Sequence, residues 1–198
     1  MTSILKADTI QDTDGNNIIN ESGNTITIGA SGDTTNIIGT LQNNGSAVGG
    51  TNTPAFEATK SDVQYGISLS TDVKITYETE IFDTAGNYAS SRFTPTTAGK
   101  YFVYCGQRMI TQSSGTLTRT KLTLYKNGSK YQNVVSDFNF TDNYTRAAGT
   151  FISATVDMNG SSDYLEVYGQ IQNTDGQTGS TGFHRDNGSV FGAYKIIE

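Results

Sequence analysis

Residues 81–104, IFDTAGNYASSRFTPTTAGKYFVY, contain the signals that decide the fold. Two breaks in this stretch, Gly86-Asn87 and Ala98-Gly99, are positions where positive φ is readily adopted, so we expect the chain to reverse there. Pro95 lies between them and has no N–H group to donate, which places it at a strand start or on a sheet edge. This order of signals is typical of strands joined by tight turns.

The end of this stretch predicts a strand with two different faces. Side chains alternate between the faces of a strand, so Tyr101, Val103 and Cys105 are expected on one face. Phe102 and Tyr104 are expected on the other face. Cys105 is then a small buried hydrophobe, and as the only cysteine of the chain it excludes an intramolecular disulfide.

The composition favours a β protein and argues against several classes of function. Of the 198 residues, 34% are hydrophobic, 16% are charged and 22 are Gly, which suits short strands and disfavours helices. The net charge is −6 and Lys and Arg are spread singly, so we expect no nucleic-acid binding. No apolar run approaches the ~20 residues of a transmembrane helix, so we expect no membrane insertion. The first residues lack the apolar region of a signal peptide, which predicts a protein that starts in a cytoplasm.

The chemistry of the chain changes near residue 53. All nine Phe and eleven Tyr lie beyond that point, and residues 1–53 instead carry Ile-rich runs between Gly, Asn and Asp turns. The runs, spaced roughly ten residues apart, predict short strands; they are Ile18-Ile19, Ile26-Thr27-Ile28 and Ile37-Ile38. Because the segment lacks aromatic side chains for a core, we expect an extended β-rich attachment or shaft segment in which three copies place their Ile on a shared axis and present Thr and Asn outward. The alternative is a flexible Gly-rich tether, and residues 49–54 are the expected hinge.

Residues 54–198 are expected to form one domain of successive strands. Alternating apolar and polar residues recur along this half, at residues 122–126, 152–158, 165–171 and 189–197. Within the third of these segments, Leu165, Val167 and Ile171 share one face. Asn127-Gly128 is a strong hairpin signal, and Asn159-Gly160 predicts a second turn.

These signals follow an order that resembles the globular head of C1q and tumour-necrosis-factor-like (TNF-like) jelly rolls. The resemblance rests on residues 81–104, Leu124-Tyr125-Lys126-Asn127-Gly128, residues 159–163 and the terminal Phe191-Gly192-Ala193-Tyr194 strand. It implies an all-β C1q/TNF-like jelly-roll β-sandwich that forms a homotrimer, with aromatic and aliphatic side chains packed along the three-fold axis. Domains of this kind are binding knobs and seldom enzymes. Lys100 departs from the family, which usually has a small or polar residue there, and this leaves the expected fold unchanged.

Residues 1–53 resemble the N-termini of structural and fibre proteins of marine tailed bacteriophages. The resemblance rests on SILKADTIQD (3–12), GNTITIGASGDT (23–34) and the run Gly39-Thr40-Leu41-Gln42-Asn43-Asn44-Gly45. It implies a virion protein that is assembled in the host cytoplasm. Residues 1–53 would then attach to other virion proteins, and residues 54–198 would form the knob.

Together the two resemblances predict a bacteriophage virion structural protein that is not an enzyme and needs no cofactor. The first hypothesis is a short trimeric tail-fibre or tail-associated knob whose distal loops adhere to a host-surface glycan or protein. The second is a trimeric capsid decoration or head-fibre protein. The third is a glycan depolymerase knob.

No pattern in the sequence identifies catalytic residues. Glu78 and Glu80 share a strand face, but a glycosidase needs two carboxylates in a cleft, and nothing indicates an aromatic-lined sugar cleft. Cys105 with His184 as its base would form a nucleophile pair, which a lone Cys and a lone His support only weakly. Nucleotide-binding loops and hydrolase elbows do not occur in the sequence.

Metal sites stay unassigned on the sequence. Asp12-Thr13-Asp14-Gly15-Asn16-Asn17 looks like the start of a calcium loop, but Gly15 is fourth rather than sixth, so an Asx-rich turn is expected. Some C1q-like trimers bind calcium near the top of the axis through loop carboxylates. Four Asp residues in expected loops could serve as such structural calcium ligands, and their spacing selects none of them: Asp137, Asp142, Asp175 and Asp186. The polar loop 173–182 is either a binding loop or an ordinary connection.

Overall fold

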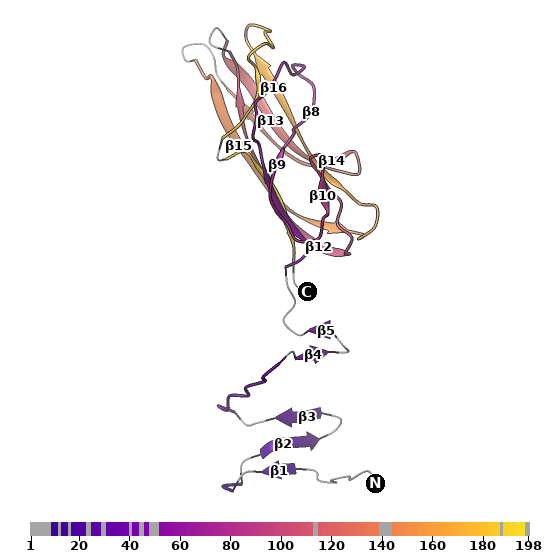
Figure 1. The fold of residues 1–198 in the computed structure, drawn as a ribbon. Helices are drawn as coiled ribbons and strands as arrows, with labels where there is room; N and C mark the ends of the chain where they lie inside the picture. Colours follow the sequence, from indigo (N-terminus) through magenta and orange to yellow (C-terminus); the bar gives the residue numbers. More distant parts are fainter. Residues whose placement is uncertain are drawn as a thin grey trace. The chain divides into compact units, whose positions relative to one another are not determined.

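The structure, a computed structural model, divides the chain into two compact units, residues 1–50 and residues 51–198. It describes residues 9–11, 13–15, 17–22, 25–28, 31–39, 41–43, 46–47, 52–112, 115–138, 144–186 and 188–196. Strands are the regular elements of both units (Figure 1). No helix in these ranges is long and apolar enough to cross a membrane.

The second unit is a sandwich of two antiparallel sheets, which confirms the expected all-β class (Figure 1). The seven-stranded sheet has the order β7 (Gln64–Tyr65), β17 (Gly182–His184), β12 (Gly99–Ile110), β18 (Val190–Lys195), β6 (Ala55–Thr59), β9 (Thr79–Asp83), and β15 (Ala147–Met158) also pairs with β12. The six-stranded sheet has the order β10 (Tyr88–Ala89), β11 (Arg92–Phe93), β16 (Leu165–Asn173), β13 (Leu117–Lys126), β14 (Ser129–Asp137), and β8 (Val73–Lys74) also pairs with β16.

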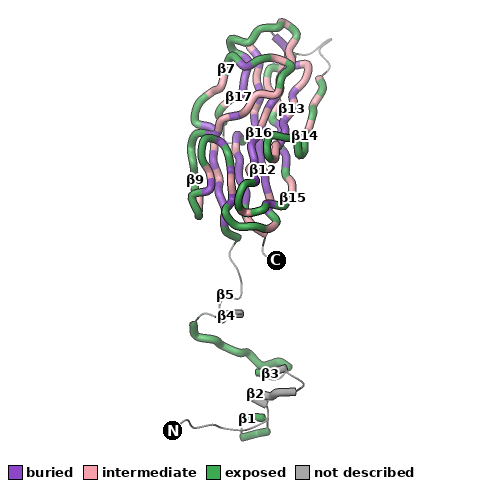
Figure 2. The backbone as a smooth tube through the Cα atoms, turned by 90° about the vertical axis from the view of Figure 1, so that its right-hand side faces the viewer, coloured by how far each residue is buried: buried purple, intermediate pink, exposed green. Residues whose placement is uncertain are grey.

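The core lies between the two sheets and follows the expected alternation. Tyr101, Val103 and Cys105 of β12 are fully buried, whereas Phe102 and Tyr104 lie on its other face, as predicted. Buried stretches, drawn in purple in Figure 2, run along the central strands β12, β13 and β16. Burial of these apolar side chains contributes most of the stability of the sandwich.

An aromatic cluster fills one part of this core. Phe56 of β6 stacks on Phe93 of β11, with ring centroids 4.5 Å apart, and so joins the two sheets. Tyr88 stacks on Phe56 at 4.6 Å, and Phe191 of β18 meets it edge-on at 4.9 Å. Aromatic pairs in these geometries add to the stabilisation from buried area alone.

Most of the expected turns are present. Asn127 and Gly128 have φ values of 53° and 76° and join β13 to β14, which confirms the hairpin. Gly86 and Gly99 also have positive φ, at 63° and 138°. The expectation for Pro95 is wrong: it lies in the loop between β11 and β12 and not in a strand. Asn87 explains this, because its backbone and side-chain oxygens accept hydrogen bonds from the N–H groups on either side of Pro95, at Thr94 and Thr96.

The two ends of the sandwich are built differently, one from the unit's first and last strands and the other from loops. We call the end at which the second unit begins the proximal end. There its first and last strands, β6 and β18, meet, because the Lys195 N–H donates to the Pro54 carbonyl at 3.1 Å. At the distal end, the other end of β12, three loops are joined by backbone hydrogen bonds from Thr111 to Arg146 and from Thr174 to Thr116. The distal loops are defined here by residues 111–112, 115–116, 144–146 and 174–181.

The first unit contains two small antiparallel sheets. The strands β1 (Thr9–Gln11), β2 (Asn17–Ser22) and β3 (Thr25–Ile28) form one sheet, and β4 (Gln42–Asn43) pairs with β5 (Ser46–Ala47) in the other. Strands at Ile18-Ile19 and Ile26–Ile28 are as predicted, but Ile37-Ile38 is not in a strand. No described strand pairs with residues 33–38, and a strand needs such a partner. Half of the expected hinge, residues 49–51, lies outside the described residues.

The turn between β15 and β16 provides a test of the fold. Gly160 has φ +70°, and a Cβ there would lie 2.2 Å from the Ala98 backbone nitrogen. We expect Gly160→Ala to lower the free energy of unfolding by at least about 2 kcal/mol, from the unfavourable φ and the clash. Gly179→Ala, where a Cβ meets nothing within 4 Å, should change it by less than about 1 kcal/mol. Urea unfolding of both variants measures the difference, and equal stabilities would contradict this turn geometry.

Candidate functional site

The outward face of the seven-stranded sheet gathers aromatic side chains from four strands. We call this set, Phe82, Phe102, Tyr104, Phe151 and Tyr194, the aromatic face. Strand register brings its members together: Phe102 pairs with Tyr194, and Tyr104 is linked through Gly192 and Glu57 to Phe82. Phe151 lies opposite Gly106, two residues along β12 from Tyr104. The Phe102 ring lies 5.4 Å from the Tyr194 ring and 6.3 Å from the Tyr104 ring.

Residues of two neighbouring strands fix the position of Tyr104 on this face. Gly192 leaves the space for the ring, since a Cβ there would lie 2.3 Å from it. The Tyr104 hydroxyl donates to Glu57 Oε2 at 2.6 Å. Burial raises the pKa of Tyr104, and the Glu57 carboxylate raises it further, so the phenol stays protonated as the donor. The centre of the aromatic face is therefore held in one arrangement.

The aromatic face is open to solvent in the single chain. Phe151 is 59% exposed, and Phe82 and Tyr194 also count among the exposed large hydrophobic residues. Single exposed apolar residues are ordinary, but a contiguous aromatic set on one sheet face marks an interaction surface. This face is the strongest candidate site of the second unit.

A depression of about 380 Å³ adjoins Phe151 at the distal part of this face. Backbone of Gly106, Gly149 and Gly188 forms part of its wall. Arg108 and Asp186 line it as well, with Arg108 Nη1 3.6 Å from Asp186 Oδ2. The aromatic face thus passes into a charged rim toward the distal end.

The outward face of the six-stranded sheet has the opposite character, because its charges are paired. Glu166 has its side chain 4% exposed, with Lys74 Nζ at 2.6 Å and the Arg92 guanidinium at 2.9 Å. Burial raises the pKa of Glu166, but hydrogen bonds from Lys74 and Arg92 outweigh burial and the net pKa is lowered. Arg92 also stacks over the Tyr164 ring, 3.9 Å from its centroid.

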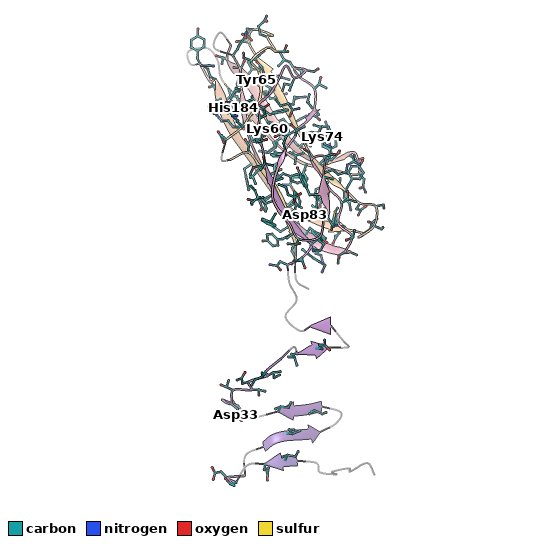
Figure 3. All side chains as sticks on the ribbon, viewed as in Figure 1. Asp33, Lys60, Tyr65, Lys74, Asp83 and His184 are labelled. Carbon is teal, nitrogen blue, oxygen red and sulfur yellow. The ribbon has the colours of Figure 1, made fainter. Side chains whose placement is uncertain are left out.

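A second group of charges on this face is also satisfied internally. Asp72 receives Lys121 Nζ at 2.5 Å, Lys130 Nζ at 2.9 Å and the Tyr125 hydroxyl at 2.8 Å. The Tyr125 ring lies 4.1 Å from that of Tyr168. In Figure 3, Lys74 lies on the side of the sandwich away from His184, in keeping with their different sheets. A face whose charged groups already pair with one another offers a binding partner few free charges to interact with.

The structure separates the Cys–His pair. Cys105 is fully buried in the core, and burial raises the pKa of its thiol to about 12. His184 pairs in register with Arg108 of β12. Arg108 is an odd number of residues from Cys105 along this strand, so it lies on the opposite, outward face. There the His184 Nδ1 atom lies 3.4 Å from Arg108 Nη1. The two residues therefore lie on opposite faces of the sheet, and the interpretation of Cys105 as a core hydrophobe is confirmed.

The two glutamates considered for glycan hydrolysis both line a depression of about 430 Å³. Glu78 accepts hydrogen bonds from the buried Lys60 ammonium at 3.1 Å and from the Thr76 hydroxyl. Burial raises the pKa of Glu78, but the bonds from Thr76, Lys60 and Ser61 outweigh it and hold the carboxyl ionised. A glycosidase needs one protonated carboxyl group as its acid, and Glu78 is unsuited to that role.

The acidic residues considered for calcium do not come together where they are described. Asp137 pairs with Arg119 at 2.5 Å, and Asp175 accepts from Gln112 at 3.0 Å, while Asp186 faces Arg108. Asp142 lies outside the described residues, as do Asp12 and Asn16 of the calcium-like loop. Within the described parts of the chain, no three His, Cys, Asp or Glu residues form a group that could hold a metal.

The loop 173–182 is tied to the sandwich. Asn173 Nδ2 donates to the Thr111 hydroxyl at 3.1 Å and to the Gln177 carbonyl at 2.8 Å. Residues 176–180 of this loop are nevertheless exposed. The distal end also exposes Tyr144, which is 83% exposed and which the sequence analysis did not select. Phe151 was also missed, although its place just before Ile152 in an alternating strand predicts an outward aromatic.

Comparison with known proteins identifies the architecture. Murine APRIL matches with a TM-score of 0.52 at 7% identity, over 72% of this chain and 98% of that chain. The Eiger TNF from S. frugiperda matches with a TM-score of 0.50 at 13% identity, over 73% and 91% respectively. The fold is a TNF-like jelly roll. No protein-family model and no curated protein matches the sequence. The likeness therefore establishes the fold alone.

The paired face of this jelly roll predicts a pH dependence. The Glu166 carboxylate, with its lowered pKa, stabilises the fold fully above its ordinary pKa of 4.5, and this contribution is lost as the pH falls through the lowered value. We expect Glu166→Gln to cost about 1–3 kcal/mol of unfolding free energy at pH 7 and much less at pH 3. Glu80→Gln, an exposed control, should cost less than about 0.5 kcal/mol. A cost for Glu166→Gln that does not shrink in acid would contradict the ion-pair account.

Proposed function

We propose that this protein is a bacteriophage virion structural protein, a short homotrimeric tail-fibre or tail-associated knob that contributes to adhesion on the host surface. The observation that carries the proposal is the aromatic face, an exposed apolar surface on a TNF-like jelly roll whose other outward face is closed by ion pairs. The proposal gives the knob no catalytic role and no cofactor.

The aromatic face supports a homotrimer. Large apolar side chains that remain exposed in one copy, Phe151 foremost, gain most when further copies cover them. Strand β15 lies at the lateral edge of the same sheet, and β14 at an edge of the other sheet exposes Tyr131 and Val135. When the aromatic face of each copy meets these two edge strands of the next, the contact is heterologous and closes as a ring.

The first unit supports attachment to other virion proteins. The Ile and Leu side chains that are described there are all exposed, so the unit presents apolar surface to a partner. Its sequence resembles the N-termini of phage structural proteins in residues 3–12 and 23–34. In this proposal residues 1–53 join the virion during assembly in the host cytoplasm, and residues 54–198 are displayed as the knob.

The distal end supports adhesion. Tyr144 projects from a distal loop, and Tyr65 of β7 is exposed beside the loop of Thr178, to whose carbonyl the Gly66 N–H donates. Tyr65 lies toward one end of the sandwich and Asp83 toward the other in Figure 3. Exposed tyrosines contact glycans and proteins through both ring and hydroxyl. Three copies in a trimer would raise the avidity of weak single sites.

A capsid decoration or head-fibre protein is the alternative, because it would use the same trimer and the same attachment segment. Copy number separates the two: immunogold labelling of virions would mark a few copies at the tail or hundreds on the head. A depolymerase is disfavoured by the ionised state of Glu78. Release of sugar from host envelope, abolished by Glu78→Gln or Glu80→Gln, would reinstate it.

The trimer is tested by placing a charge on the aromatic face. Phe151→Glu should weaken association at least about 100-fold, because three carboxylates would be buried without partners. The substitution leaves the core intact, since the Phe151 side chain points outward. Gln170→Glu adds the same charge on the paired face and should leave the trimer unchanged. Light scattering at micromolar concentration measures both, and a monomeric unmodified chain would overturn the proposal.

Adhesion is tested at the distal end. Tyr144→Ala should lower the binding of the labelled protein to host cells at least about tenfold, because each trimer would lose three aromatic contacts. Ser161→Ala, in the proximal turn, should bind as the unmodified protein does. Both variants should remain trimers. If Tyr144→Ala binds as well as the unmodified protein, the adhesion contact does not lie in this loop.

A further inference from the structure

Lys60 carries a buried positive charge that lies outside both the aromatic face and the distal loops. Its side chain is 0% exposed, and its ammonium group donates to the Thr76 carbonyl at 2.8 Å, the Thr76 hydroxyl at 3.0 Å and Glu78 Oε1 at 3.1 Å. A buried ammonium group is costly unless its donors are satisfied. These three bonds satisfy all of its donors, so Lys60 is fixed beside the Thr76 hydroxyl.

The Thr76 hydroxyl lies between a carboxylate and an amide. It donates to Glu78 Oε1 at 2.5 Å, and its oxygen is 3.3 Å from Gln64 Oε1. The other Glu78 oxygen accepts from the Ser61 N–H at 3.0 Å, which holds the carboxylate in place. Burial raises the pKa of Glu78, but the bonds from Thr76, Lys60 and Ser61 outweigh burial and the net pKa is lowered. Glu78 is therefore an ionised acceptor for the hydroxyl proton.

The side-chain amide of Gln64 is held at both ends. Its Nε2 donates to the Lys74 carbonyl at 2.8 Å, and its Oε1 accepts from the Thr76 N–H at 3.1 Å. The Gln64 Cδ atom is one bond of about 1.2 Å from Oε1, so it lies within about 4.5 Å of the Thr76 hydroxyl oxygen. Reacting atoms need a separation of about 3–3.5 Å, which a movement of about 1 Å in the Gln64 side chain supplies.

We propose that Thr76 and Gln64 form an intramolecular ester cross-link in a single reaction within the folded chain. The Thr76 hydroxyl oxygen attacks Gln64 Cδ while its proton passes to Glu78. The electron pair of the carbonyl moves to Gln64 Oε1, where the Thr76 N–H stabilises the negative charge. When the carbonyl forms again, the C–N bond breaks, and the amide nitrogen takes the proton from Glu78 and leaves as ammonia. Glu78 ends ionised, as it began, and the reaction needs no oxidant, reductant or further reactant.

Lys60 favours the Thr76 hydroxyl over its own amine as the nucleophile. Its ammonium group, 3.0 Å from the hydroxyl oxygen, stabilises the negative charge that develops there as the proton leaves. An ammonium group that donates three hydrogen bonds has no free electron pair with which to attack. An amide between Lys60 and Glu78 would also require attack on a carboxylate, which is a poorer electrophile than the Gln64 amide.

The cross-link would join the two sheets where the chain crosses from one to the other. Gln64 lies in β7, which pairs with β17 of the seven-stranded sheet. Thr76 follows β8, which pairs with β16 of the six-stranded sheet. Closing the loop of residues 65–75 restricts the unfolded chain and so stabilises the fold. This covalent reinforcement does not depend on which surface the knob binds, and it goes beyond the proposed function.

The test is a tryptic peptide map of the unmodified full-length protein. Trypsin cuts after Lys and Arg, so it separates Gln64, in peptide 61–74, from Thr76, in peptide 75–92. The ester keeps the two peptides together in one species, lighter than their sum by one ammonia, about 17 Da. Mild alkali should cleave this species into two peptides, whereas a chain that trypsin left uncut stays whole. We expect the linked species in most molecules, and a map with only the separate peptides would overturn the proposal.

Variants locate the cross-link and its proton acceptor. Thr76→Val removes the nucleophile at nearly constant shape and should yield only the separate peptides, whereas Thr76→Ser should keep the linked species. Thr71→Val, which removes an exposed hydroxyl in the same loop, is the matched control and should also keep it. Glu78→Gln should lower the linked fraction at least about tenfold at equal times after synthesis. A linked species that persists in Thr76→Val would overturn the assignment, and the map of the unmodified protein tests it even if a variant fails to fold.

Discussion

The structure of the second unit depends on the alternation of side chains along β12. This strand pairs with β15, β17 and β18, and its two faces are both rich in apolar side chains. Tyr101, Val103 and Cys105 fill the core from one face, while Phe102 and Tyr104 form the centre of the aromatic face from the other. A central strand that is apolar on both sides needs cover on both sides. The six-stranded sheet supplies one cover, and on the other side Phe82, Phe151 and Tyr194 are exposed in the single chain.

The two outward faces of the sandwich show how the surface is divided. On the six-stranded sheet, Glu166 and Asp72 are each surrounded by two cations, so the charges there are satisfied without a partner. On the seven-stranded sheet, the Tyr104–Glu57 hydrogen bond orders the aromatic side chains but leaves the rings open. Of the two outward faces, the aromatic face has more free energy to gain from being covered, and this asymmetry is what makes it the stronger candidate for an interaction surface.

Local patterns in the sequence predict those parts of the fold that local physics decides. The faces of residues 101–105 follow from the strand period, and the Asn127-Gly128 turn follows from the ease with which both residues adopt positive φ. The predictions for Pro95 and for Ile37-Ile38 were wrong because the local structure there depends on distant partners. For Pro95 these partners are the hydrogen bonds of Asn87, and for Ile37-Ile38 no described strand is present to pair with. The aromatic face could be predicted only in part, because Phe82, Phe102 and Tyr194 become neighbours through the strand order, which local sequence does not encode.

The same constraint governs both units, although their compositions differ. Each contains exposed apolar side chains on a sheet, aromatic in the second unit and isoleucine in the first. The aromatic rings of the second unit supply a large apolar area per residue. In the first unit the opposed Ile10, Ile19 and Ile28 form one narrow row, and the next pair in register joins Ile26 to Glu21. A small apolar row cannot by itself offset the entropy of bringing chains together. Of these two apolar surfaces, the aromatic face therefore offers a partner more buried area.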